Sequence, residues 1–256
     1  MRSLEEGLRA SRAAGRKLLV PYITGGVEGW EDAIRAAALA GADAVEIGIP
    51  FSDPVMDGPV IQAASQRALD AGATPAGIVD AVGRLDAGIP LAVMTYYNLV
   101  FRAGHQRFAQ SLIAAGIAGA IVPDLPLEEC GPWCDAADAA GVETVMLAAP
   151  TAPDERLVRI CARSRGFVYA VGVLGVTGER DRLADSAVEM ARRLKAVTDL
   201  PVLVGVGVSN AAQAAAAVRV ADGVIQGASV VRHLLDGGPE AVGAYVAEVR
   251  AAIDAV

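Results

Sequence analysis

The sequence contains few of the residues that would support several other classes of protein. Only three cysteines occur in 256 residues, an odd number without the paired spacing of a zinc site, so we expect neither a disulfide framework nor structural zinc. Gly, Pro, Asp or Asn interrupts every apolar run well before the ~18 residues that cross a bilayer. The N-terminal stretch carries Glu5 and Glu6 and does not resemble a secretory signal. These features predict a cytoplasmic protein with no membrane span.

Lysine and histidine are also scarce, with two residues of each. Lys17 begins a predicted strand and Lys195 lies inside a predicted helix, so no lysine stands at the C-terminal end of a strand, where a Schiff base would form. His105 and His233 are far apart in sequence and have no second ligand at metal spacing. We therefore exclude an imine aldolase and expect neither a metal nor an organic cofactor.

Aromatic residues make up only 4% of the chain, whereas apolar residues as a whole make up 54%. The core must then be built from Ala, Val, Ile and Leu, which is typical of closely packed strands and helices in α/β proteins. The formal net charge is −8, and the charges are spread over many helices rather than gathered in one basic block. A nucleic acid is therefore not an expected partner.

Short β-branched runs alternate with Ala-rich helical stretches along the whole chain, and we count eight such units. The predicted strands cover residues 17–24, 44–49, 91–96, 120–122, 144–148, 167–171, 202–205 and 223–225. The predicted helices include residues 30–40, 75–85, 106–115, 128–140, 154–163, 187–197, 210–218 and 239–252.

This repeat, with no linker in it, predicts one domain over residues 1–256 and an α/β fold, a single (β/α)8 barrel (TIM barrel). Eight parallel strands could also form an open doubly wound sheet, but the near-uniform unit length and the lack of a long crossover favour closure. In such a barrel the active residues lie at the C-terminal ends of the strands.

Glu46 is the first candidate for chemistry because it alternates with aliphatic residues along the second strand. Val45, Ile47 and Ile49 share one face, so Glu46 points to the other. If the aliphatic residues pack against helices, Glu46 faces the barrel interior, where desolvation raises the pKa of a carboxyl group toward neutrality. A buried structural Glu held by backbone donors or by an Arg is the alternative at this stage.

The loop that follows this strand offers a second carboxylate. It contains three prolines and two aspartates within ten residues, a composition that stiffens the chain above the barrel mouth. Asp53 is better read as a turn residue. Asp57 precedes a Gly-Pro pair deeper in the loop, and we favour it as the second catalytic carboxylate, with Tyr169 or Tyr96 as possible helpers.

Three Gly-rich segments at the ends of the last three strands predict an anion site. They cover residues 172–178, 205–210 and 227–229. Glycine lets backbone N–H groups approach an anion, and barrels often bind phosphate between the loops after strands 7 and 8, at the N-terminus of a short extra helix. Residues 229–233 are a plausible helix of this kind. The expected substrate is therefore a small phosphorylated molecule.

Five motifs resemble one family over nearly the whole chain. They are PYITGG, VEIGIPFSDPVMDGPVIQ, MTYYNLVF, VPDLPLEE and GVTG. Together they are similar to the alpha chain of tryptophan synthase. The resemblance implies a barrel that splits indole-3-glycerol phosphate into indole and glyceraldehyde 3-phosphate, in an αββα complex whose β chain receives the indole.

The resemblance also implies roles for single residues. Glu46 would be the general acid that protonates indole C3, and Asp57 would bind the indole N–H and stabilise charge that develops on the ring. Tyr169 would line the pocket beside Glu46 as a third catalytic residue. The expected substrate-binding residues are Tyr22, Tyr96, Gly178, Gly207, Gly227 and Ala228.

The chain departs from the family pattern at three places. Val27-Glu28 replaces an Asp-Pro pair after the first strand, Val173 lies where the family commonly begins the sixth loop with Ser-Arg, and Ala228 replaces a serine. The backbone N–H of Ala228 can still bind phosphate, with the loss of one hydroxyl bond worth about 1.5 to 3 kcal/mol to a charged group.

Three alternatives to the complexed lyase stay open from the sequence. One is a free-standing indole-3-glycerol-phosphate lyase, which needs no β chain. Another is a non-catalytic barrel that only regulates a β chain, although such a protein has no physical need for a costly carboxylate in the barrel mouth. The third is a different phosphosugar enzyme, such as an isomerase, whose pocket would lack apolar room for an indole ring.

Overall fold

The eight predicted strands form a closed parallel barrel in the order β1 to β8. The computed structural model describes residues 3–172, 185–205 and 207–256. The strands are β1 (Leu18–Thr24), β2 (Val45–Gly48), β3 (Leu91–Met94), β4 (Gly119–Ile121), β5 (Glu143–Ala148), β6 (Val168–Val171), β7 (Val202–Gly205) and β8 (Gly223–Gln226). The first and last strands pair directly, with Leu18 opposite Gly223, so the prediction of closure is confirmed and the open sheet is wrong.

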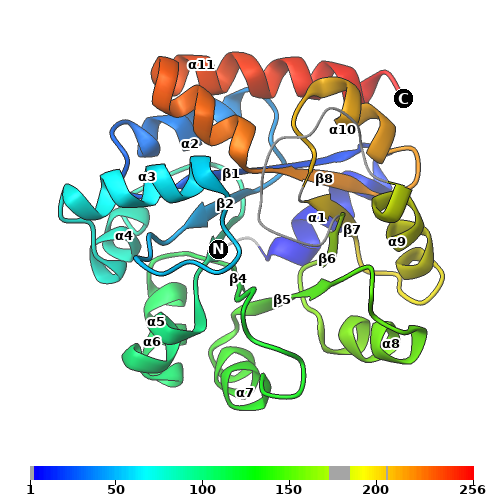
Figure 1. The fold of residues 1–256 in the computed structure, drawn as a ribbon, viewed down its shortest axis with the longest axis horizontal. Helices are drawn as coiled ribbons and strands as arrows, with labels where there is room; N and C mark the ends of the chain where they lie inside the picture. The colour runs from blue at the N-terminus through cyan, green and yellow to red at the C-terminus, as the bar shows by residue number, and fades with distance from the viewer. Residues whose placement is uncertain (1–2, 173–184, 206) are drawn as a thin grey trace.

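Helices surround the strands (Figure 1). They are α1 (Leu4–Ala13), α2 (Trp30–Leu39), α3 (Pro59–Asp70), α4 (Pro75–Val82), α5 (Tyr97–Ala103), α6 (His105–Ala114), α7 (Gly131–Ala140), α8 (Asp154–Arg163), α9 (Asp185–Lys195), α10 (Ala211–Ala217) and α11 (Ala228–Asp254). Helix α11 is bent at Gly238, which has a φ of 70°, and Pro239 follows the bend. The helix predicted at residues 229–233 is the start of its first arm.

The strands alternate between two apolar layers, as the barrel geometry requires. Val45 and Ile47 belong to the outer layer that packs against the helices. Val20, Ile121 and Leu203 belong to the inner layer that fills the barrel. Because the outward face of β2 is fully apolar, the intervening Glu46 faces the interior, as the alternation predicted.

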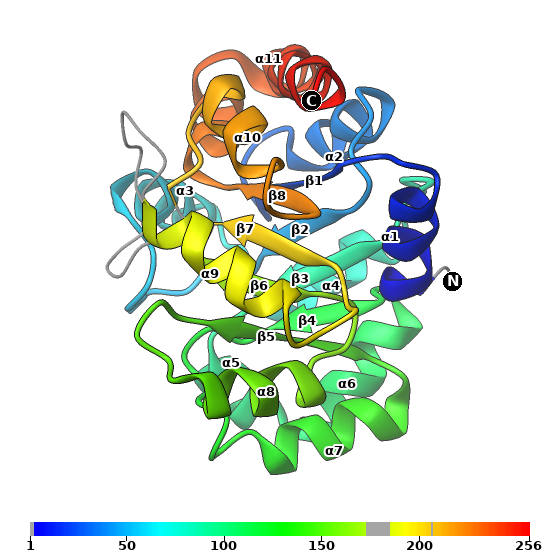
Figure 2. The ribbon, with the colours of Figure 1, turned by 90° about the vertical axis from the view of Figure 1, so that its right-hand side faces the viewer.

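Helix α1 covers the N-terminal end of the barrel. Its Leu4 and Leu8 are fully buried and join the inner apolar layer. In Figure 2 this helix lies at the right, whereas the segment between β2 and α3 emerges at the opposite end. The mouth at the C-terminal ends of the strands is therefore the end available to a ligand.

The sequence analysis did not include α1, α3 and α5 among its helices. Helix α3 begins at Pro59, directly after the loop that carries Asp57, and α5 is only seven residues long. In the part of the chain that the structure describes, every helix is too short or too polar to cross a bilayer.

Candidate active site

Glu46 is buried in the barrel mouth, where its side chain is 1% exposed. Burial, and secondly the negative charge of Asp57, raise the pKa of Glu46 to about 8. Within the described residues, no donor reaches its Oε2 atom. At this oxygen, nothing supports the alternative of a structural Glu held by an Arg or by backbone donors. A carboxyl group with this pKa can deliver a proton near neutral pH.

Asp57 is held in place by the loop that carries it. Its backbone carbonyl accepts a hydrogen bond from Gln62 Nε2 at 2.7 Å, and the phenol of Tyr96 accepts one from the amide of Met56 at 3.1 Å. Burial raises the pKa of Asp57 to about 6, while a hydrogen bond from Tyr96 lowers it. Asp53, by contrast, is exposed and accepts a bond from Ser52, as expected for a turn residue.

Two buried tyrosines lie beside the carboxylates, and a glycine makes room for each ring. Tyr22 pairs with Glu46 across β1 and β2, and its ring lies against Gly48. Tyr169 lies in the same way against Gly205 of the neighbouring strand β7. A Cβ atom at either glycine would collide with the tyrosine ring, so both glycines are needed for this arrangement.

The two tyrosines and Glu46 line one small cavity of about 40 Å³, together with the ends of strands β7 and β8. Gly207, which has a φ of 94°, follows β7, while Gly227 and Ala228 lead from β8 into α11. The amide groups at the start of this helix carry partial positive charge. The cavity thus joins a proton donor to a place suited to an anion.

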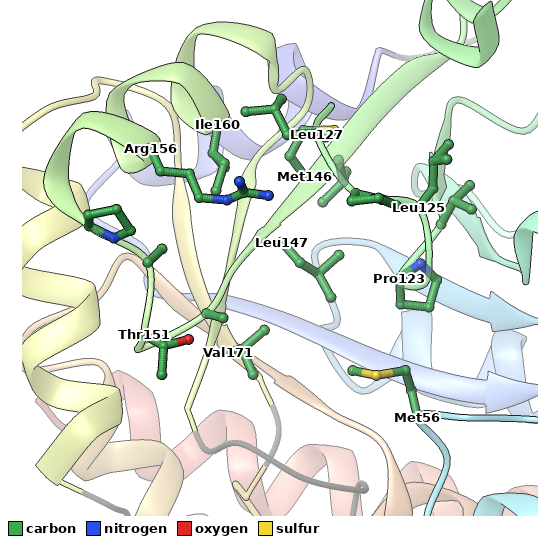
Figure 3. A pocket seen from close by; sticks show the side chains of 16 residues that line it. Met56, Pro123, Leu125, Leu127, Met146, Leu147, Thr151, Arg156, Ile160 and Val171 are labelled. Carbon is green, nitrogen blue, oxygen red and sulfur yellow. The ribbon is translucent and has the colours of Figure 1, made fainter. Parts of the chain in front are cut away.

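A larger cavity of about 430 Å³ lies at the ends of strands β4, β5 and β6. Figure 3 shows Met56, Leu147 and Val171 around it, with Arg156 reaching in from α8. Val171 follows Tyr169 by two residues on β6, so consecutive inward positions of one strand line the small and the large cavity. The large cavity provides apolar room of the size that small-molecule ligands occupy.

The structure brings together most of the predicted site residues. Those that line the small cavity are Tyr22, Glu46, Tyr169, Gly207, Gly227 and Ala228. Asp57 and Tyr96 are joined by a hydrogen bond, and the charge of Asp57 acts on Glu46. Gly178 and Val173 lie outside the described residues.

The sequence analysis missed several lining residues. In the small cavity these are Ile61, Met94 and Ile225, whereas Val208 and Ser209 belong to the segment 205–210 that was expected to bind an anion. Met94 and Ile225 lie at strand ends, where the barrel rule could have identified them. Ile61 lies in α3, a helix that was not predicted. The described residues contain no group of three or more His, Cys, Asp or Glu side chains placed to hold a metal ion.

The fold and this mouth define a (β/α)8-barrel protein with a buried carboxyl group in a mouth that ends at the N-terminus of a helix. The family model for the tryptophan synthase alpha chain matches residues 8–252. The chain therefore belongs to the tryptophan synthase alpha chain family. The alpha subunit of this family is a lyase that cleaves indole-3-glycerol phosphate to indole and glyceraldehyde 3-phosphate. The activity predicted from the sequence is therefore confirmed.

Individual relatives agree with this assignment. The chain is 46% identical to the tryptophan synthase alpha chain of Thermobifida fusca over 243 residues, covering 92% of this chain and 90% of the relative. It is 44% identical to that of Halorhodospira halophila, covering 99% and 97%. A chain of Mycobacterium tuberculosis tryptophan synthase superposes with a TM-score of 0.91 at 40% identity, with 99% of each chain covered.

Proposed function

We propose that Glu46 is the general acid of indole-3-glycerol phosphate cleavage and that Asp57 is the carboxylate that stabilises charge on the indole ring. The observation that carries this proposal is the protonatable Glu46, buried between Tyr22 and Tyr169 in a cavity that ends at Gly207, Gly227 and Ala228. Near pH 7 a carboxyl group with a pKa of about 8 is mainly protonated. It can then donate a proton without first having to acquire one.

The proposed step conserves atoms and charge. Glu46 transfers its proton to C3 of the indole, which places positive charge on the ring system near N1, where the ionised Asp57 binds the N–H and stabilises it. The carboxylate that Glu46 has become takes the proton of the adjacent glycerol hydroxyl, and this allows the C–C bond to break. The electrons of that bond return to the ring, so the products are indole and an aldehyde, and the net proton count is unchanged.

The remaining contacts divide the substrate between two ends of the mouth. The amides at Gly207, Gly227 and Ala228 would hold the phosphate. Tyr22, Tyr96 and Tyr169 would flank the ring. The apolar 430 Å³ cavity lined by Val171 supports an aromatic substrate. It argues against a phosphosugar isomerase, which has no use for such room.

We further propose that a tryptophan synthase β chain binds at the rim of the mouth. The relatives of known structure include Mycobacterium tuberculosis tryptophan synthase. Two large apolar side chains are exposed at the same rim: Val55, in the loop after β2, is 66% exposed, and Phe101, on helix α5, is 65% exposed. Val55 lies two residues from Asp57, so a chain that covers it would contact the loop that positions this carboxylate.

The mutation Glu46→Gln tests the proposed acid. The amide keeps the shape of the side chain but lacks the acidic proton, so we expect kcat for indole release to fall about 100- to 10,000-fold, with little change in the affinity for glycerol 3-phosphate. Asp57→Asn should also reduce kcat, and Asp53→Asn in the same loop is the matched control that should remain close to wild type. Near-normal turnover by Glu46→Gln would show that the acid is a different group.

The same assay, run with and without a β chain, separates the remaining alternatives. A slow isolated chain that the β chain stimulates is the result expected here, whereas a fast isolated chain would indicate a free-standing lyase. A chain that cleaves no indole-3-glycerol phosphate under either condition, yet alters β-chain activity, would indicate a regulatory barrel.

A further inference from the structure

Helix α11 connects the proposed phosphate end of the site to the outside of the barrel. Its first arm starts at Ala228, and the bend at Gly238 folds the second arm back. The second arm packs on α2 and α10 (Figure 1). Helix α10 follows the loop after β7, residues 207–210, which we call the β7 loop. The two arms therefore reach both segments that would hold the phosphate.

A stacked pair of rings joins the two arms. His233 of the first arm lies on Tyr245 of the second, with ring centroids 4.3 Å apart and an angle of 16° between the planes. The Nδ1 atom of His233 lies 2.8 Å from the carbonyl oxygen of Ser229. A carbonyl can only accept, so Nδ1 carries the proton. The imidazole is thereby fixed to the first turn of α11, directly after Gly227 and Ala228.

The other ring of the pair holds the β7 loop. The hydroxyl of Tyr245 donates to the carbonyl oxygen of Ser209 at 3.2 Å. The backbone amide of Ser209 donates a hydrogen bond to Gln213 Oε1 at 2.6 Å. Both backbone groups of Ser209 are therefore bonded, two residues after Gly207. Tyr245 is 6% exposed, which strengthens a hydrogen bond relative to one in water.

We propose that His233 and Tyr245 are positioning residues that set the spacing between the β7 loop and the start of α11, and so the affinity of the site for the phosphate of its substrate. This inference rests on the phosphate end assigned above. Neither ring lines the cavity, so they act only through the backbone that they hold. An anion site made of backbone amides depends on such spacing, because its donors cannot move independently to follow the ligand.

Two variants test the proposal in the isolated chain. Tyr245→Phe keeps the stack and removes the hydroxyl that bonds to Ser209. We expect the dissociation constant of glycerol 3-phosphate and the KM for indole-3-glycerol phosphate to rise about three- to tenfold. His233→Leu removes the stack and should raise both values at least as much. In both variants kcat should stay within about twofold and the inhibition constant of indole should not change, because the indole end is untouched.

A second tyrosine and histidine pair provides the matched control. Tyr97 lies on α5, away from the β7 loop, stacks on His105 at 5.7 Å, and its hydroxyl lies 3.1 Å from that imidazole. Tyr97→Phe removes an equivalent hydroxyl and should leave glycerol 3-phosphate binding unchanged. A thermal unfolding curve for each variant shows that it is folded.

The outcomes distinguish this inference from the proposed function. If the wild type cleaves indole-3-glycerol phosphate and folded Tyr245→Phe and His233→Leu bind glycerol 3-phosphate as tightly as the wild type, the positioning role is wrong and the lyase assignment stands. An equal loss of kcat and affinity for both indole and glycerol 3-phosphate would also overturn it, since that is general loosening of the barrel. A wild type that neither cleaves this substrate nor binds glycerol 3-phosphate would overturn both.

Discussion

Glu46 and Asp57 are two carboxyl groups that differ in pKa, so at neutral pH one is protonated and the other is ionised. Burial raises the pKa of both groups, that of Glu46 to about 8 and that of Asp57 to about 6. Asp57 keeps the lower value because Tyr96 donates a hydrogen bond to it, whereas its own negative charge disfavours ionisation of Glu46. Between these two values the mouth holds one acid and one anion, the pair that the proposed chemistry requires.

The rate should therefore depend on pH as a bell-shaped curve. Activity rises as Asp57 loses its proton near pH 6 and falls as Glu46 loses its proton near pH 8, so kcat/KM for the isolated chain should be highest at about pH 7. Stopped-flow or coupled assays of indole release from pH 5 to 9 would measure it. In Asp57→Asn the acidic limb should disappear and the basic limb should move to lower pH. A basic limb that does not respond to this change would argue against coupling of the two groups.

Single residues show what sequence alone can and cannot predict. The inward direction of Glu46 follows from strand alternation, which is a local property. The room that Gly48 makes for Tyr22, and Gly205 for Tyr169, depends on which strands are neighbours and on their register. Register is a property of the assembled barrel, so this pairing of small and large residues was not predictable.

Among the elements, the strands could be predicted more completely than the helices. All eight strands were found because buried parallel strands are continuous β-branched runs between glycines. Helix α1 was missed because it is largely polar and buries only Leu4 and Leu8. Helix α5 was missed because a seven-residue segment rich in aromatic residues lacks a helical period. Such short or polar helices form because they pack on the assembled barrel, and this packing cannot be read from their own sequences.

One carboxylate of the barrel binds the N-terminal end of helix α1. Glu143 at the start of β5 accepts hydrogen bonds from the hydroxyl of Ser3 at 2.7 Å and from the amide of Leu4 at 2.6 Å, at the positive end of the helix. Glu143→Gln should lower the free energy of unfolding by about 1 to 2 kcal/mol. It should leave kcat unchanged, because the helix covers the end opposite the site.

Urea denaturation and indole release, measured on the same preparation, would check this prediction. Glu6→Gln, in the first turn of the same helix, is a suitable control because its side chain makes none of these contacts with the barrel. Loss of activity in folded Glu143→Gln would indicate that the two ends of the barrel are coupled.

At the scale of the whole molecule, the rim of the mouth should bind the β chain. Phe101→Asp places a charge in the proposed interface, where it would have to be desolvated. We expect the stimulation of indole release by a β chain to fall at least tenfold, with the basal rate of the isolated chain within about twofold of wild type. Titration of each variant with β chain measures this stimulation. Leu39→Asp, at the exposed last residue of α2, is the control. Full stimulation of Phe101→Asp would place the interface elsewhere.

The barrel closes by pairing β1 with β8, which are the first and last strands of the sequence. The proposed acid lies on β2 and the proposed phosphate contacts follow β7 and β8, so a bound substrate reaches across that seam. Part of its binding free energy then opposes separation of the first and last strands. A bound substrate therefore holds the first strands of the barrel against the last ones, and it should stabilise the closed ring of strands against unfolding.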